Sequence, residues 1–144
     1  MTPPPFDVAA CEAKLVVLAD LLDDLDRQGL SSGADLRNDR DRRHVVERIL
    51  TQLVDIASGL NAILARAVAH RAPTGYREGF DLVAKAGVLS TELTERLLPS
   101  VGMRNILTHE YGTVGLDVVA NAIPSALRDY GDYVRQIRSY LEQY

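Results

Sequence analysis

The sequence predicts an all-α fold, an up-and-down bundle of four main helices with one additional short helix. Apolar residues recur at steps of three and four along most of the chain, no segment alternates as a half-buried strand would, and Gly or Pro separates the periodic segments. With 144 residues, no Trp and two Phe, the core must be built mostly from Leu, Val, Ile and Ala. We expect one domain over residues 1–144, with residues 1–6 flexible.

The first helix is expected from about Asp7 to Gln28, with Asp7 as its N-cap and Gly29 as its stop. Its apolar residues recur at helical spacing; they are Val8, Cys11, Leu15, Leu18, Leu22 and Leu25. An acidic cluster lies among them, consisting of Asp20, Asp23, Asp24 and Asp26. Because no histidine accompanies these carboxylates, we interpret them as a solvated helix face and predict no metal site.

A polar stretch over residues 29–33 separates this helix from a long second helix, which ends before Pro73. The apolar stripe of the second helix consists of Val45, Ile49, Leu53, Ile56, Leu60, Ile63 and Ala67. Further apolar residues widen this face, namely Val46, Leu50, Val54 and Leu64. The face is wider than one packing partner needs, so one edge of it could serve a second subunit.

A short helix is predicted over residues 76–86, closed by Gly87. Ser90 is the expected cap of the next helix. That helix contains Pro99, which removes a backbone donor and clashes with the preceding turn, so we expect a bend near Leu98.

The last helix follows a tight turn bracketed by Gly112 and Gly115. Asp117 is its expected cap, and Pro124 marks a bend near its start. The apolar stripe again steps by three and four, through Leu127, Tyr130, Val134, Ile137, Leu141 and Tyr144.

The charge balance argues against a protein that wraps nucleic acid non-specifically, because 16 basic and 20 acidic residues give a net charge of −4. The acidic excess lies in the first 26 residues, and the rest of the chain is rich in arginine. The run from Arg37 to His44 holds four Arg and two Asp. It is either an exposed helix start with local ion pairs, or an RNA contact through Arg40, Arg42 and Arg43, and the two readings are compatible.

Cys11 is the single cysteine, so no intramolecular disulfide framework exists and a reducing compartment is expected. The first residues lack the pattern of a secretory signal, and no apolar stretch is long enough to cross a membrane. We therefore expect a cytoplasmic protein without membrane contact.

The segment Arg104-Asn105-Ile106-Leu107-Thr108-His109-Glu110-Tyr111 holds a permanent cation, an imidazole and a phenol at the end of a helix. On a regular helix Arg104 and His109 lie about 140° apart, whereas Asn105 and His109 share a face. A site that uses both needs the helix to unwind near His109, or a twofold-related copy to complete it. Alternatively, Arg104 and His109 simply complement the negative end of the helix dipole. The lone histidines His44 and His70 are interpreted as surface residues.

This segment resembles the Arg-x4-His-x-Tyr signature of the HEPN superfamily, in particular the HepT-like ribonuclease toxins that pair with MntA-type nucleotidyltransferase antitoxins. The resemblance covers residues 10 to 140 and includes Arg43-His44, Tyr76-Arg77-Glu78-Gly79-Phe80, Ala86-Gly87-Val88-Leu89 and Gly102-Met103-Arg104-Asn105. Members of the family often carry an acidic residue in the middle of the second helix. Gln52 and Asp55 stand there in this chain, and the sequence does not choose between them.

The resemblance implies the toxin of a type VII HepT/MntA toxin–antitoxin system, a metal-independent endoribonuclease without a cofactor, acting on tRNA or mRNA. By resemblance, Arg104 and His109 are catalytic, Asn105 supports them, and the antitoxin silences the toxin by attaching AMP to Tyr111. Chemically, Arg104 suits a phosphate clamp and His109 suits proton transfer near neutral pH. Two copies in a homodimer would supply acid and base separately.

Two alternatives stand beside this hypothesis. The chain could be a non-catalytic helical adaptor or substrate-binding partner of a nucleotidyltransferase, with the motif kept for binding alone. Tyr111 could merely pack at the end of its helix, as the C-terminal tyrosines Tyr130, Tyr133, Tyr140 and Tyr144 are expected to pack in the core or an interface.

Overall fold

Six helices and no strand make up the part of the chain that the structure describes, residues 2–109 and 115–144. The structure is a computed structural model. Its helices are α1 (Val8–Gln28), α2 (Gly33–Asn38), α3 (Arg40–Val68), α4 (Tyr76–Lys85), α5 (Thr91–His109) and α6 (Leu116–Leu141). The all-α prediction is confirmed, with one short helix more than expected.

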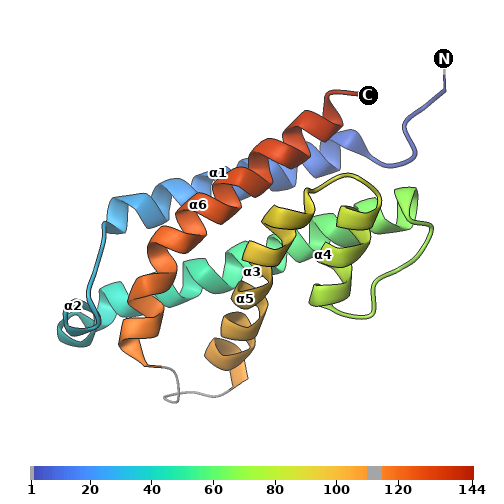
Figure 1. Cartoon of the computed structure of the whole chain (residues 1–144). Helices are drawn as coiled ribbons and strands as arrows, with labels where there is room; N and C mark the ends of the chain where they lie inside the picture. Colours follow the sequence, from blue (N-terminus) through green and yellow to red (C-terminus); the bar gives the residue numbers. More distant parts are fainter. Residues whose placement is uncertain (1, 110–114) are drawn as a thin grey trace.

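The long helix α3 contacts each of the other five helices. In Figure 1, α1 and α6 run side by side in opposite directions, and α4 and α5 lie beside α3. The residues that widen the apolar face of α3 are all buried within the chain; they are Val46, Leu50, Val54 and Leu64. Because packing inside one chain uses this width, the face does not by itself predict a second subunit.

The predicted helix ends are confirmed at several places. Asp7 accepts a hydrogen bond of 3.0 Å from the backbone of Ala10, and Ser90 caps α5 in the same way at 3.1 Å. Gly29 and Gly87 follow α1 and α4 with φ angles of +72° and +82°, a conformation that favours glycine. The helix α5 continues through Pro99 to His109, and the bend near Leu98 stays a prediction.

The polar stretch before α3 contains a helix that the pattern did not predict. Ser32 Oγ accepts from the backbone of Asp35 at 3.1 Å, and Asp35 Oδ2 accepts from the backbone of Ser32 at 2.9 Å. This reciprocal capping box starts α2, whose one large apolar residue, Leu36, is fully buried. The serines and glycine that suggested a loop are the start of a helix.

The prediction that Asp117 caps the last helix is wrong. The N-cap of α6 is Gly115, which offers no side chain, and Asp117 lies inside the first turn. Its carboxylate lies against Gly33, where an added Cβ would overlap it. The start of α6 is therefore positioned by close packing on α2, a contact that the unrecognised helix concealed.

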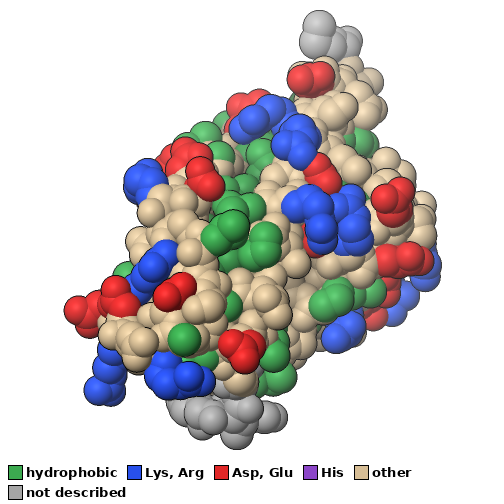
Figure 2. All heavy atoms as spheres, turned by 60° about the vertical axis from the view of Figure 1, so that its left-hand side comes forward, with side chains coloured by type: hydrophobic (Ala, Val, Ile, Leu, Met, Phe, Trp, Pro, Cys, Tyr) green, Lys and Arg blue, Asp and Glu red, His purple; other side chains and the backbone are tan. Residues whose placement is uncertain are grey.

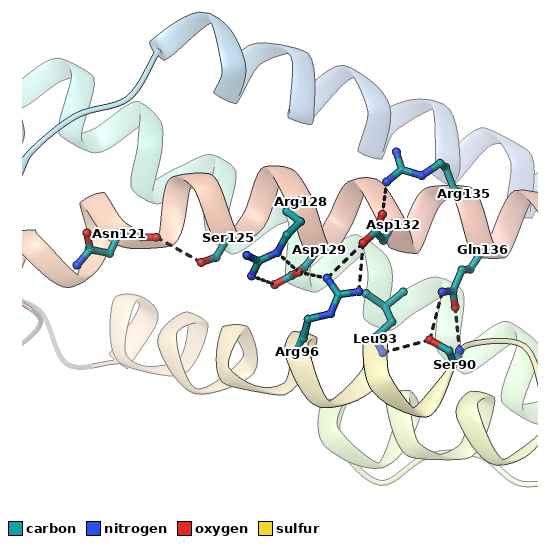
Figure 3. A network of polar contacts seen from close by, with 10 residues as sticks. All are labelled: Ser90, Leu93, Arg96, Asn121, Ser125, Arg128, Asp129, Asp132, Arg135 and Gln136. Carbon is teal, nitrogen blue, oxygen red and sulfur yellow. Dashed lines mark hydrogen bonds and ion pairs between the residues drawn. The ribbon is translucent and has the colours of Figure 1, made fainter.

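The first part of α5 is fastened to α6 by a network of polar side chains (Figure 3). Arg96 Nη1 donates to Asp129 Oδ1 at 2.7 Å and to Asp132 Oδ2 at 3.2 Å. The backbone of Ser90 donates to Gln136 Oε1 at 2.8 Å. The carboxylate of Asp129 is almost completely buried, so these bonds also satisfy a charge that water does not reach. They set where α5 lies, and with it the segment that carries Arg104.

Two of the four C-terminal tyrosines lie in the core, as expected. Tyr130 and Tyr133 are buried, and Tyr133 donates from its hydroxyl to Asn61 Oδ1 at 2.7 Å. Tyr140 and Tyr144 pack their rings against Phe6.

Candidate active site

Arg104 is held by side chains from two other helices. Its Nε donates to Asp55 Oδ1 of α3 at 2.8 Å, and the hydroxyl of Tyr76, the first residue of α4, donates to the same oxygen at 2.9 Å. The guanidinium carbon lies 5.2 Å from the centroid of the Tyr76 ring, within the range of a cation–π contact. These contacts orient the guanidinium group and engage its Nε edge. Nη1 also donates to Thr108 Oγ1 at 3.5 Å, so the donors left for a ligand are the remaining ones on the two terminal nitrogens.

Burial and the hydrogen bond to Asp55 raise the pKa of Tyr76 above its ordinary value. The phenol therefore stays protonated at neutral pH and remains a donor to the carboxylate. The arrangement is a chain of three groups in which Asp55 accepts from both neighbours, so the position of Arg104 depends on all three.

The start of α4 and the second half of α5 enclose a hollow of about 660 Å³ beside this triad. Its walls are Thr74, Gly75, Tyr76, Arg77, Glu78, Val101, Arg104 and Asn105. Val101 and Asn105 are four residues apart and share a face of α5, so they form one side of the hollow. Arg104, one residue before Asn105, borders it.

His109 is exposed and ends α5. The helix is intact up to this residue, so unwinding ahead of His109 does not bring it to Arg104. The sequence-based geometry holds: Asn105 and His109 lie on one face, and Arg104 is displaced from His109 by about 140°. Two explanations of the spacing between Arg104 and His109 remain. Either a second copy of the chain completes the site, or the two residues complement the negative end of the helix dipole.

A second cavity, of about 390 Å³, lies on the other side of Arg104, between α5 and α6. Leu97, Met103, Val118 and Ala122 are among its mostly apolar walls, and neither Asn105 nor His109 lines it. Arg104 borders both cavities, Asn105 lines only the hollow beside α4, and His109 lines neither.

The sequence did not choose between Gln52 and Asp55 as the acidic or polar partner in the long helix, which is α3. In the structure, Asp55 contacts Arg104 and Gln52 does not. Gln52 lines a separate groove between α1 and α3, together with His44 and Arg48. Both His44 and the other lone histidine, His70, are exposed, which confirms that they are surface residues.

The three arginines at the start of α3 do not line the hollow. Arg40 is exposed, whereas Arg42 donates to the carbonyl of Gln28 and Arg43 Nε donates to Glu47 Oε1 at 2.8 Å. Arg42 thus satisfies the C-terminal end of α1, and Arg43 makes the kind of local ion pair that the sequence suggested. Their contact with RNA stays a prediction.

Tyr111, the predicted site of modification, lies outside the described residues, as does Gly112. The acidic cluster in α1 is solvated, and Asp24 pairs with Arg27. Within residues 2–109 and 115–144, no group of three or more His, Cys, Asp or Glu side chains could hold a metal ion. No helix in the same part of the chain has the length and apolarity needed to cross a bilayer.

Sequence reasoning missed Tyr76 as a partner of Arg104. In the sequence, Tyr76 was recognised only as part of a segment typical of the family and as the start of a predicted short helix. Its partners Asp55 and Arg104 are 21 and 28 residues away along the chain. Because tyrosine has an apolar ring and a polar hydroxyl, the sequence could suggest that the ring packs against a neighbour and that the hydroxyl makes a hydrogen bond. It could not say which residues are the neighbours.

The chain is similar to known proteins over most of its length. Residues 18–137 match the family model described as "Ribonuclease HepT-like". A tRNA nuclease HepT of Aphanizomenon flos-aquae is 34% identical over 131 residues, which are 90% of this chain and 88% of that protein. An mRNA nuclease HepT of Shewanella oneidensis is 28% identical over 94 residues, 65% of this chain and 68% of that protein.

The fold is similar to a solved structure of a tri-AMPylated Shewanella oneidensis HEPN toxin in complex with an MNT antitoxin. The TM-score is 0.81 at 20% sequence identity, over 92% of this chain and 98% of that one. At this level of identity, the likeness establishes the arrangement of the helices.

Proposed function

The chain belongs to the HepT-like ribonuclease family, and on this premise we propose that it cleaves RNA at the hollow beside Arg104, as the toxin of a pair with an MntA-type nucleotidyltransferase antitoxin. It is an endoribonuclease by family. The observation that carries the choice of site is the fixed Arg104, held by Asp55 and Tyr76 on the helix that also presents Asn105 and His109.

The proposed reaction needs a base, an acid and a cation. The imidazole of His109 takes the proton of the RNA 2′-hydroxyl, whose oxygen attacks the adjacent phosphorus. The bond from phosphorus to the 5′-oxygen breaks, a cyclic phosphate forms, and the 5′-oxygen takes a proton from a protonated imidazole. Arg104 offsets the charge that develops on the phosphoryl oxygens, and Asn105 orients the substrate. This sequence of steps needs no metal ion.

We further propose that a homodimer provides the second imidazole, because each chain offers one histidine on this face of α5. Adding an excess of His109→Ala protein to wild-type protein, with time for exchange, should then lower the activity per wild-type chain, since mixed dimers lack one proton-transfer group. An activity unchanged by such mixing, while mixed dimers are seen by native mass spectrometry, would rule out a shared site.

The central test is cleavage of a total RNA preparation, which contains both tRNA and mRNA. Wild-type protein should degrade RNA, and His109→Ala and Arg104→Ala should each be at least a hundredfold slower. The surface variant His70→Ala is the matched control and should keep full activity. RNA loss at the same rate with His109→Ala would reject the site, and an intact pool with wild-type protein would favour the non-catalytic adaptor.

Silencing is proposed to occur by transfer of AMP to Tyr111, two residues after His109. A bulky anion there would repel and obstruct an RNA phosphate. Protein made together with an MntA-type nucleotidyltransferase should gain AMP, as seen by mass spectrometry, and Tyr111→Phe should abolish the gain. Tyr144→Phe, at an exposed tyrosine far along the chain, is the control. Modification that persists in Tyr111→Phe would reject the assignment.

A further inference from the structure

Two guanidinium groups, from different helices, border the hollow beside α5. Arg104 is oriented by Asp55, whereas Arg77 of α4 is exposed and takes part in none of the ion pairs found among residues 2–109 and 115–144. The acid next to it, Glu78, is engaged elsewhere, by Thr74 and by Arg71 at 3.3 Å. Arg77 is therefore a cation in the wall of the hollow whose charge no carboxylate of the described chain neutralises.

Arg77 lies on the side of α5 that presents His109. A Cβ added at Gly102 would be 3.6 Å from Arg77 Nη2, so this guanidinium group rests against α5 at Gly102. Gly102, Asn105 and His109 follow one another at steps of three and four and form one stripe of the helix. Arg104 is about 160° from Gly102 around the same helix. The two cations thus stand on opposite sides of Asn105.

This placement matches the chemistry of an RNA backbone, which offers phosphates at regular intervals along the strand. Arginine binds a phosphate through two parallel donors, and an arginine that already serves a carboxylate has fewer donors to offer. On the basis of the ribonuclease function proposed above, we propose that Arg77 binds an RNA phosphate next to the one that is cleaved. Arg104 then acts on the reacting phosphate, and Arg77 holds the strand along the stripe that leads to His109.

The experiment measures binding of a fluorescein-labelled, single-stranded 2′-O-methyl RNA of mixed sequence by anisotropy at several salt concentrations. Such an RNA lacks the attacking hydroxyl, so binding is separated from cleavage. Arg77→Gln should weaken binding roughly tenfold, as loss of one charged contact implies. The slope of log K against log salt should fall by about 0.7, the value for one phosphate of a single strand. Arg77→Lys should keep the slope, because the charge is retained.

Arg138→Gln removes an exposed arginine of α6 that does not line the hollow, and it should leave both affinity and slope unchanged. Circular dichroism should give the same melting temperature for all variants. With unmodified RNA, Arg77→Gln should raise KM and leave kcat within about twofold, because the reacting groups stay in place. An affinity and slope equal to wild type for Arg77→Gln would overturn the proposal.

The outcomes separate this proposal from the ribonuclease function. If wild-type protein cleaves RNA and Arg77→Gln behaves as wild type in binding, the enzyme assignment stands and the role of Arg77 is lost. If wild-type protein cleaves no RNA but Arg77→Gln alone loses the salt-dependent contact, the phosphate site stands and the catalytic role of the motif is lost.

Discussion

Replacing Asp55 by alanine should release Arg104, and the size of this effect follows from the contacts of the carboxylate. One oxygen accepts both the 2.8 Å bond from Arg104 and the 2.9 Å bond from Tyr76. The Arg104 side chain is 21% exposed and that of Asp55 is 35% exposed, so water screens the pair in part. A buried charged hydrogen bond contributes about 1.5–3 kcal/mol and an exposed ion pair contributes less than about 1 kcal/mol. We therefore expect a coupling energy of about 1 kcal/mol.

A double-mutant cycle measures this coupling directly. The free energy of unfolding in urea is determined for the wild type, Asp55→Ala, Arg104→Ala and the double variant. Cleavage of RNA is measured on Asp55→Ala and the wild type, where we expect a loss of roughly tenfold, because a displaced guanidinium group forfeits about 1.4 kcal/mol of transition-state stabilisation. In the Arg104→Ala background, the additional replacement Asp55→Ala should lower the rate of RNA cleavage hardly any further.

Two results would refute this reasoning. A coupling energy below about 0.3 kcal/mol would mean that the pair is too well solvated to position the arginine. An equal loss of activity on removing Asp55 with and without Arg104 would mean that Asp55 acts on the substrate itself. Tyr76→Phe keeps the ring over the guanidinium group and removes only the hydroxyl, so its effect should be smaller than that of Asp55→Ala.

Two further predictions concern stability. Gly33→Ala should lower the free energy of unfolding by about 1–3 kcal/mol, because the new Cβ would overlap the carboxylate of Asp117 and lie 2.9 Å from its backbone nitrogen. The control is Gly131→Ala, where the helix has room for the methyl group, and it should raise the free energy of unfolding by up to about 1 kcal/mol. If urea unfolding gave the same change for both variants, the packing argument would be contradicted. Burial alone would raise the pKa of Asp132, but hydrogen bonds from arginines, that of Arg135 foremost, hold it below its ordinary value. A lowered pKa means that the stability Asp132 contributes is present above about pH 4 and is lost as pH falls through the folded pKa. The difference in melting temperature between wild type and Asp132→Asn should therefore shrink on acidification below about pH 4. A difference that grows would mean that the pKa of Asp132 is raised by folding and not lowered.

The main helices could be predicted from the sequence because their signals are local. Asp7 and Gly29 mark α1, and Ser90 marks the start of α5, through bonds within three or four residues. The short helix α2 could not be predicted from apolar periodicity, since one buried leucine in six residues shows no repeat. The capping box of Ser32 was visible in principle, with aspartate in place of the usual glutamate at the third position.

In the candidate site, too, the features set by local spacing could be predicted, whereas those set by packing between distant segments could not. The positions of Asn105 and His109 on one helix face follow from their spacing alone. The choice of Asp55 over Gln52 depends on how α3 is rotated against α5, and the two side chains differ by about 60° around α3. Because the apolar face of α3 is broad, periodicity does not fix this rotation closely enough. Only the packed structure, in which five helices surround α3, determines which side chain reaches Arg104.

The balance of charges around the site limits how RNA can bind. Asp55 orients Arg104 but also cancels most of its charge at longer range, so the hollow attracts a strand chiefly through Arg77 and through short contacts. Figure 2 shows another part of the surface, the side that lies to the left in Figure 1, where basic and acidic side chains are interspersed around apolar ones. Two phosphate contacts per chain predict a slope of only about −1.4 for log K against log salt. A slope steeper than about −3 per chain would show that further cations bind the strand, and Arg40 at the start of α3, which is exposed, would be the first to replace.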